Sequence, residues 1–144
     1  MKIRAARRND LSAIKILLTE SGLPASDVDA TLLEYFLVAE REDGKIVGTI
    51  GLERFRQSAL LRSLVVAPSV RNQGLSSRLL ARAELAARAS GICELWLLTT
   101  TAAALFRRCG YADADRGAAP EEVQASAQFA KLCPASAACM RKVL

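Results

Sequence analysis

The segment RNQGLSS, from Arg71 to Ser77, carries residue types that bind phosphate, at a point where a helix is predicted to begin. The first N–H groups of a helix have no acceptor within it, and with the helix dipole they attract anions. Gly74 would let the backbone approach a phosphate closely, Arg71 would add a charge with several donors, and Ser76 would add a hydroxyl. The spacing matches neither the Walker loop nor the dinucleotide motif. A pyrophosphate cradle and a simple turn, for which the glycine supplies only the conformation, are equal alternatives on spacing alone.

Hydrophobic periodicity and turn residues predict the element order β α α β β β α β α β α β. Strands are expected at residues 2–7, 35–42, 46–53, 59–67, 93–100, from 111, and at 137–144. Helices are expected at residues 11–21, 26–35, 73–90, 101–111 and 120–130. Asp43 and Gly44 predict the tight turn of a hairpin, and Glu84 is placed largely outside the buried stripe of its helix. The sequence thus predicts one mixed α/β domain over residues 1–144.

Composition narrows the classes of function. The 144 residues are 51% hydrophobic and 24% charged, which is typical of a folded globular domain. The net charge of +5 is not gathered into a basic stripe with aromatic residues, so we expect no nucleic-acid partner. No apolar run approaches the ~18 residues of a membrane span, and no signal-peptide pattern is present, so we expect a cytoplasmic protein without a membrane partner. With no histidine and no CxxC pair, no metal site is expected.

Three segments resemble a known family. The strand LRSLVVAP, the loop Arg71–Ser76 and the long helix after it resemble the [Q/R]-x-x-G-x-[G/A] motif of the GNAT superfamily of acetyl-CoA-dependent N-acetyltransferases. More narrowly, LLRSLVVAP, LLTTTAAALFRRCGY and FAKLCPASAACM resemble a GNAT subfamily associated with arsenic-resistance operons, which is itself similar to the acetyltransferase domain of amino-acid N-acetyltransferases. The resemblance implies the GNAT fold, a mixed, mostly antiparallel twisted sheet flanked by helices, with acetyl-CoA as co-substrate.

The resemblance also implies where the coenzyme lies. The backbone of Leu64 to Val66 would pair with the pantetheine arm, the amides of Arg71 to Ser77 would hold the pyrophosphate, and the helix of Phe106 would lie opposite. The implied coenzyme residues are Leu64, Val65, Val66, Arg71, Asn72, Gln73, Gly74, Leu75, Ser76, Ser77, Ala103, Phe106 and Arg107. Ser76 departs from the usual Gly or Ala but keeps its N–H. Phe106 stands where many members have a tyrosine that protonates the thiolate, so water or another side chain such as Tyr111 would supply that proton.

An acceptor site is expected beside the coenzyme. N-acetyl transfer needs a neutral amine, and without histidine the candidate bases are the carboxylates Glu53, which we prefer, and Glu40. A solvated carboxylate at the strand end is an equal alternative for Glu53. Arg62 lies among apolar residues of its strand, where a charge must be paired or face a cleft. It could grip a substrate carboxylate, or form an internal ion pair with Glu53 or Glu94. Thr99 and Ser136 are further candidate contacts, with capping as the alternative for Thr99.

The sequence therefore predicts an N-acetyltransferase that moves an acetyl group to the amine of a small molecule, an amino acid or an analogue. Attack on the thioester would be direct, with the carbonyl polarised by a backbone N–H near Val65 or Val66. One alternative is acetylation of a protein N-terminus or lysine. Another is a CoA-binding sensor without catalysis, which Phe106 favours. The protein is expected to be a monomer or a homodimer.

Overall fold

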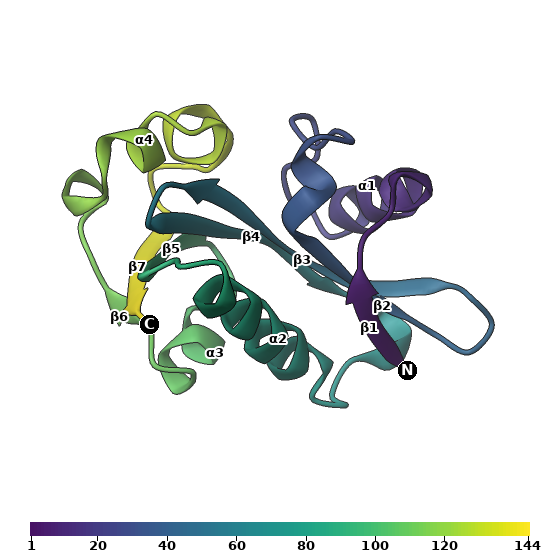
Figure 1. The fold of residues 1–144 in the computed structure, drawn as a ribbon. Coiled ribbons are helices and arrows are strands. Elements are labelled where there is room, and N and C mark those ends of the chain that lie inside the picture. Colours follow the sequence, from purple (N-terminus) through teal and green to yellow (C-terminus); the bar gives the residue numbers. More distant parts are fainter.

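Seven strands form one twisted sheet in the order β1-β2-β3-β4-β5-β7-β6 in the computed structural model, which describes residues 1–144 (Figure 1). The strands are β1 (Lys2–Ala5), β2 (Phe36–Glu40), β3 (Ile46–Phe55), β4 (Ser58–Val66), β5 (Glu94–Thr99), β6 (Ala112–Asp113) and β7 (Ala138–Val143). All neighbouring pairs are antiparallel except β4 and β5, which are parallel. The predicted mixed, mostly antiparallel sheet is confirmed.

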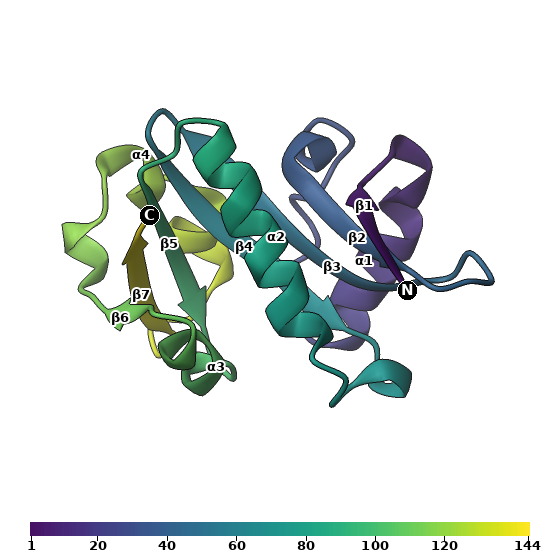
Figure 2. The same ribbon diagram turned by 60° about the horizontal axis from the view of Figure 1, so that its bottom comes forward.

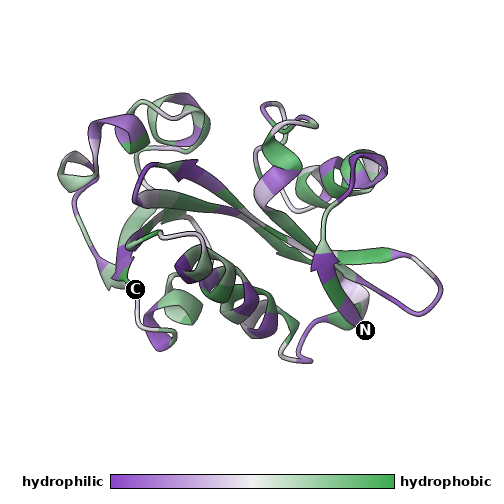
Figure 3. Ribbon diagram, in the orientation of Figure 1, coloured by the Kyte–Doolittle hydropathy of each residue, from purple (hydrophilic) through white to green (hydrophobic).

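The helices cover both faces of this sheet. They are α1 (Leu11–Glu20), α2 (Leu75–Ala89), α3 (Ala103–Arg108) and α4 (Glu121–Gln124). Figure 1 shows α1 and α4 on one face and α2 and α3 on the other. The central strands in Figure 3 are largely hydrophobic, whereas the helices alternate between hydrophobic and hydrophilic residues, as expected when one side of each helix is buried. None of the helices is both long enough and apolar enough to cross a bilayer.

The contact between β4 and β5 is short. Parallel pairing is confined to Ser58 with Glu94, Ala59 with Leu95, and Leu60 with Trp96. Beyond Leu60 the two strands diverge, as Figure 2 shows. The edge of β4 that faces β5 therefore has no strand partner from Leu61 to Val66, and its backbone groups are open to another partner.

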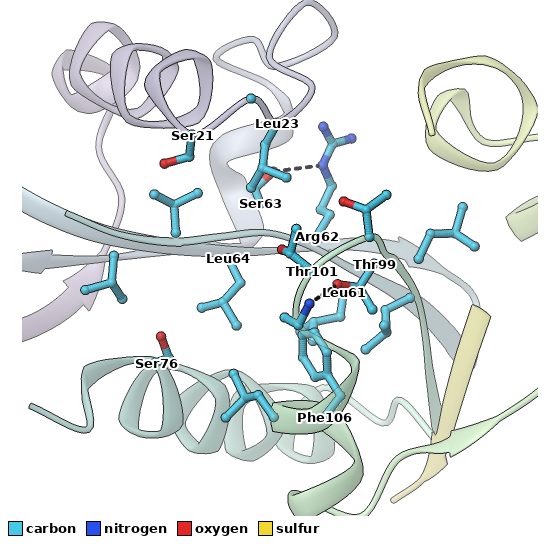
Figure 4. Close-up of a pocket in the computed structure, with 18 of the residues that line it drawn as sticks. Ser21, Leu23, Leu61, Arg62, Ser63, Leu64, Ser76, Thr99, Thr101 and Phe106 are labelled. Carbon is cyan, nitrogen blue, oxygen red and sulfur yellow. Dashed lines mark hydrogen bonds between the residues drawn. The ribbon is translucent and has the colours of Figure 1, made fainter. Parts of the chain in front are cut away.

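A β-bulge lies in this same part of β4. Thr49 of β3 is paired with Val65, but Gly51 is paired with Arg62, so the register shifts between them. Ser63 in the bulge has a φ of 60°, in the left-handed region that side chains rarely adopt. Figure 4 shows Arg62 and Ser63 on the α1 face of the sheet and Leu64 on the α2 face. The bulge thus places two consecutive residues, Arg62 and Ser63, on the same face, where a regular strand would alternate them.

Two predicted helices are shorter than expected. In the segment 26–35 only a 3₁₀ turn, Leu32–Tyr35, is formed. Asp29 accepts a hydrogen bond from the Leu32 N–H at 2.9 Å, a local bond that competes with a continuous helix. In the segment 120–130, α4 ends at Gln124, and the Ser126 hydroxyl donates to the Val123 carbonyl at 2.6 Å. A π-helical turn, Gln128–Leu132, follows.

The long helix α2 also differs in detail from its prediction. It begins at Leu75 rather than at residue 73, because Asn72 and Gly74 have φ values of 63° and 73° that turn the chain before the helix starts. Glu84 was expected on its outer side and is instead buried. It accepts hydrogen bonds from the Tyr111 hydroxyl and from Lys142 Nζ, each at 2.9 Å. A tyrosine hydroxyl and a lysine ammonium from distant parts of the chain therefore stabilise a carboxylate that periodicity alone would expose.

Candidate active site

A cleft of about 1060 Å³ opens where β4 and β5 diverge. Its walls come from Leu61–Val66 of β4, from the segment that follows α1, from the loop before α2 and the first turn of α2, from the end of β5, from α3 and from the π-helical turn (Figure 4). Because β4 contributes side chains to both faces, the cleft has two halves. One half lies beside α2 and α3, and the other beside the segment after α1 and the π-helical turn.

The half beside α2 is built to hold an anion. Arg78 N–H makes the first backbone bond of the helix, to the Gly74 carbonyl at 3.1 Å, so the N–H groups of Leu75 to Ser77 have no acceptor within the helix. The Arg71 Nε donates to the Val66 carbonyl at 3.3 Å, which holds the guanidinium beside the open edge of β4. Arg71 forms no ion pair, and its terminal N–H groups stay available. Backbone donors, the helix dipole and a fixed charge thus meet in one place.

The half beside α1 contains a buried charge cluster. The Arg62 side chain is fully buried, with Nη1 at 2.6 Å and Nη2 at 2.7 Å from the two carboxylate oxygens of Asp27. Its Nη1 also lies 3.1 Å from Glu53 Oε1, and its Nε donates to the Ser63 hydroxyl at 3.1 Å. A guanidinium has five N–H donors, and four are engaged in these bonds. Arg62 therefore has one N–H left, on Nη2.

Asp27 is held as a carboxylate by this arrangement. Burial alone would raise the pKa of Asp27, and it is the largest single influence, but the hydrogen bonds and positive charge of Arg62 together lower the pKa below its ordinary value. The internal ion pair that sequence analysis kept as the alternative for Arg62 is present with Glu53, and its stronger partner is Asp27. Glu94 instead pairs with Arg141 at 2.7 Å.

Most of the predicted site residues line the cleft. These are Arg62, Leu64, Val65, Val66, Arg71, Asn72, Gly74, Leu75, Ser76, Ser77, Thr99 and Phe106. Thr99 also accepts a hydrogen bond from the Ala102 N–H at 3.0 Å in the turn before α3, but the N-cap of α3 is Ala102 and no side chain caps the helix, so the predicted capping by Thr99 is wrong. The cleft brings these residues together from segments that are far apart in the chain.

Five predicted site residues do not line the cleft: Glu53, Gln73, Ala103, Arg107 and Ser136. Arg107 pairs with Asp113 on the surface at 3.0 Å, and the cleft is lined instead by Arg108, the next residue of α3. Glu53 lies behind Arg62, and Ser136 is exposed outside the cleft. The arginine that lines the cleft is therefore the one that follows the predicted Arg107 in α3.

No carboxylate lines the cleft, and its ionisable side chains are Arg62, Arg71, Arg108 and Cys133. Tyr111, the side chain named as a possible proton donor, points elsewhere: its hydroxyl donates to Glu84 at 2.9 Å. Burial, reinforced by the charge of Glu84, raises the pKa of Tyr111 strongly. Tyr111 is therefore not placed to protonate a group in the cleft.

Three residues at or beside this cleft were not predicted from the sequence: Asp27, Arg108 and Gln128. Asp27 is separated from Arg62 by 35 positions, and no periodicity connects the two. The turn residues that surround Asp27 were assigned to a helix. Gln128 lies in the π-helical turn, whose spacing differs from that of an α-helix, so its inward side could not be read from a 3.6-residue period.

Comparisons with known proteins agree with this architecture. Residues 33–113, more than half of the chain, match the acetyltransferase (GNAT) domain. The amino-acid acetyltransferases of Ectopseudomonas mendocina (strain ymp) and Pseudomonas fluorescens (strain Pf0-1) are each 40% identical over 81 residues. That match covers 55% of this chain and only 18% of either relative.

Solved structures share the whole fold. N-acetylglutamate synthase from Neisseria gonorrhoeae, complexed with coenzyme A and N-acetyl-glutamate, superposes with a TM-score of 0.85 at 24% identity, over 99% of this chain and 35% of that one. A Mycobacterium tuberculosis protein in complex with CoA has a TM-score of 0.82 at 23% identity, over 100% and 99% of the two chains. The divergence of β4 from β5 and the family match lead to one conclusion: the chain belongs to the GNAT acetyltransferase family.

Proposed function

We propose that the protein transfers the acetyl group of acetyl-CoA to the amine of a small acceptor, an amino acid or an amino-acid analogue. The observation that carries the proposal is the meeting, in one cleft, of the open edge of β4 with the anion-binding start of α2. Membership of the GNAT family, the coenzyme bound to the similar structures, and the 40% identity to amino-acid acetyltransferases support it.

The coenzyme would lie across the α2 half of the cleft. Its pyrophosphate would accept hydrogen bonds from the N–H groups of Leu75 to Ser77 and from Arg71, because these donors lack protein partners. Its pantetheine arm would extend along Leu64 to Val66, where the strand edge is unpaired. Phe106 would cover it from α3. Arg108 offers a further positive charge in the wall, in the role first assigned to Arg107.

The chemistry would be a direct attack of the amine nitrogen on the thioester carbonyl. A backbone N–H near Val65 or Val66 would donate to the carbonyl oxygen as negative charge develops on it. The new C–N bond forms, the C–S bond breaks, and the thiolate leaves. Since neither Phe106 nor Tyr111 offers a proton to the cleft, water would protonate the thiolate.

The amine must lose a proton before or during attack. With no carboxylate in the wall, we propose that Glu53 acts through water: only its Oε1 contacts Arg62, and its side chain is 22% exposed. Without such a relay the cleft would be able to bind the coenzyme yet turn over slowly. A CoA-binding module without catalysis is therefore the second candidate, and the absence of a carboxylate and a tyrosine hydroxyl from the cleft wall favours it.

The size of the acceptor follows from the half beside α1. The segment after α1 and the π-helical turn both border it, which suits a small molecule better than a protein chain. Thiol chemistry adds one analogue class: Cys133 lines the cleft, and soft thiols favour arsenic, so arsenic-containing amino-acid analogues belong among the acceptors to be tried.

The test is thiol release from acetyl-CoA by the purified protein with amino acids, arsenic- and phosphorus-containing analogues, polyamines and peptides, with CoA binding measured by calorimetry in the same preparation. Turnover confined to small amines that carry a carboxylate supports the proposal. Turnover of peptides alone would favour the protein acetyltransferase alternative. CoA binding without any turnover would favour the non-catalytic module, and a protein that does not bind CoA would contradict both.

A further inference from the structure

The π-helical turn builds part of the acceptor half of the cleft. Its closing bond joins the Cys133 N–H to the Gln128 carbonyl at 3.0 Å, five residues back. Helical turns of this width are rare overall and are frequent at functional sites. Gln128, Leu132 and Cys133 of this segment all line the cleft. The wide turn therefore contributes side chains to the wall where the acceptor is proposed to bind.

The side-chain amide of Gln128 forms a hydrogen bond within the protein through its oxygen and none through its nitrogen. The residue is 5% exposed, and its Oε1 accepts a hydrogen bond from Cys133 Sγ at 3.5 Å. Its Nε2 makes no hydrogen bond within the protein. Trp96 Nε1 is the only side-chain nitrogen or oxygen that has neither a hydrogen-bond partner nor contact with solvent. Gln128 Nε2 has no partner either, so it must be in contact with solvent, which it reaches through the cleft. A nearly buried amide donor without a protein partner is expected to serve a ligand.

Cys133 fixes which end of the amide faces the cleft. Burial raises the pKa of the Cys133 thiol, so the sulfur keeps its proton at neutral pH and acts as a donor. In the structure the S–H faces the amide oxygen at 3.5 Å, which leaves the NH₂ group turned away from the thiol. The thiol thereby presents Nε2 to the ligand without touching the reacting atoms.

The charges around this point favour a carboxylate. Arg116 and Arg62 place positive charge near Cys133, and Asp27 is the negative group that acts on it. The Arg116 guanidinium donates to the carbonyl of Pro134, a cleft residue, which holds the charge at the rim. Arg62 is fully buried and its charge is balanced by Asp27 and Glu53, so Arg116 is the basic group at this rim that has no carboxylate partner. No carboxylate in the wall opposes an anion at Gln128.

We infer that Gln128 determines acceptor specificity by donating a hydrogen bond from Nε2 to a carboxylate oxygen of the acceptor, with Cys133 as the residue that positions the amide. The inference rests on the proposed function and deepens it. It also changes the role of Arg62, which is fully buried against Asp27 and Glu53 and holds the wall of the site without clamping a substrate carboxylate.

The test compares wild type, Gln128→Leu and the isosteric Gln128→Glu, with Gln57→Leu as the matched control, because Gln57 is exposed in the turn between β3 and β4. Each protein is first titrated with CoA by calorimetry. The CoA-loaded protein is then titrated with the twenty common L-amino acids and with the decarboxylated amine of each one that binds. Steady-state kinetics with acetyl-CoA follow for the same compounds.

We expect at least one amino acid to bind wild type, and Gln128→Leu to raise its Kd and KM about tenfold or more, the effect of losing a hydrogen bond to a charged group. Gln128→Glu should lose more, because it brings two carboxylates together. CoA affinity, the KM for acetyl-CoA and the constants for decarboxylated amines should be unchanged in both. Cys133→Ser should resemble wild type, whereas Cys133→Ala should show a smaller loss than Gln128→Leu.

Two results would overturn the inference while leaving the proposed function intact. One is unchanged amino-acid affinity in both Gln128 variants, and the other is an equal loss for amino acids and decarboxylated amines. Wild type that binds CoA but none of the twenty amino acids would overturn it as well. Failure of wild type to bind CoA would instead remove the proposed function itself.

Discussion

Arg62 and Asp27 lie 35 residues apart in the chain and form a bidentate pair, with N–O distances of 2.6 and 2.7 Å. The pair joins the segment after α1 to β4 at the acceptor half of the cleft. Glu53 adds a second carboxylate, so the three side chains carry one positive and two negative charges. An arginine neutralised in this way holds the wall of the site together, and it has little capacity left to bind a ligand.

Removing the Asp27 charge should destabilise the fold. Breaking a fully buried pair costs about 3–5 kcal/mol, and since Glu53 remains as a partner of Arg62 we expect Asp27→Asn to lower the free energy of unfolding by less, about 1–3 kcal/mol. Urea unfolding followed by circular dichroism measures this. Asp113→Asn is the control: Asp113 is 62% exposed in its pair with Arg107, and such pairs contribute about 0–1 kcal/mol. Equal effects of the two variants would contradict a structural role for Asp27.

The same pair predicts a dependence of stability on pH. The pKa of Asp27 is lower in the folded protein than its unfolded value of about 3.9. A lowered carboxyl pKa stabilises the fold fully above the unfolded pKa, and the contribution is lost as the pH falls through the folded pKa. The difference in unfolding free energy between wild type and Asp27→Asn should therefore be constant above pH ~5 and shrink below pH ~4. Urea titrations at several pH values would show this, and a difference that stays constant down to the acid limit would be incompatible with it.

Arg71 is expected to contribute to coenzyme affinity. It is unpaired, lines the cleft and stands beside the free N–H groups of α2. Arg71→Ala should weaken CoA binding about tenfold or more, since a hydrogen bond to a charged group contributes about 1.5–3 kcal/mol. Arg78→Ala is the matched control on α2, exposed and outside the cleft. Calorimetry would exclude Arg71 from the site if both variants bound CoA like wild type.

Tyr111 should matter for stability and not for catalysis. Its hydroxyl bonds to the buried Glu84, which also accepts from Lys142. Tyr111→Phe removes one partner of a buried carboxylate and should lower the free energy of unfolding by about 1–3 kcal/mol. The kcat and its pH profile should be unchanged, because the hydroxyl does not reach the cleft. A selective loss of kcat with normal stability would reverse this assignment.

Glu53 provides the test of proton removal. If Glu53 accepts the amine proton through water, Glu53→Gln should reduce kcat near neutral pH and shift activity to higher pH, where more of the amine is already neutral. The CoA affinity should be unchanged, because Glu53 lies on the acceptor face. An unaltered pH profile would show that solvent alone removes the proton and that Glu53 acts only as a partner of Arg62.

Local patterns predicted most of the fold. The alternation in β2 and β3 and the Asp43–Gly44 turn specify their hairpin, and Gly44 has the positive φ, 87°, that the turn needs. The apolar stripe of α2 and the apolar run of β5 were also recognisable. The helix expected at 26–35 was wrong over most of its length, and the helix expected at 120–130 is interrupted at residues 125–126 before a π-helical turn continues it. In both segments hydroxyl or carboxyl side chains bind nearby backbone groups and compete with a continuous helix.

The site, like the fold, was predictable from the sequence where it depends on local patterns. The anion-binding start of α2 is contiguous in sequence, so residue types and spacing were sufficient to find it. The acceptor half is assembled by tertiary contacts: Asp27, in the segment after α1, pairs with Arg62 of β4, and Gln128 lies in a π-helical turn. Neither the ion pair nor the inward amide has a periodic pattern in the chain. Residues that meet only after folding are those that sequence analysis could not place.

The short pairing of β4 with β5 has a consequence for the folded state as a whole. Three residue pairs are the only direct ladder between β4 and β5, where the two parts of the sheet meet. A ligand that bonds along the open edge of β4 and contacts α3 would act as an additional strand and join both parts. Its binding would then stabilise both parts together and raise the free energy of unfolding by about 2.7 kcal/mol at a ligand concentration one hundred times Kd. The cell's supply of coenzyme would thus set how rigid this sheet is and how readily its β5–β7 side exchanges amide hydrogens.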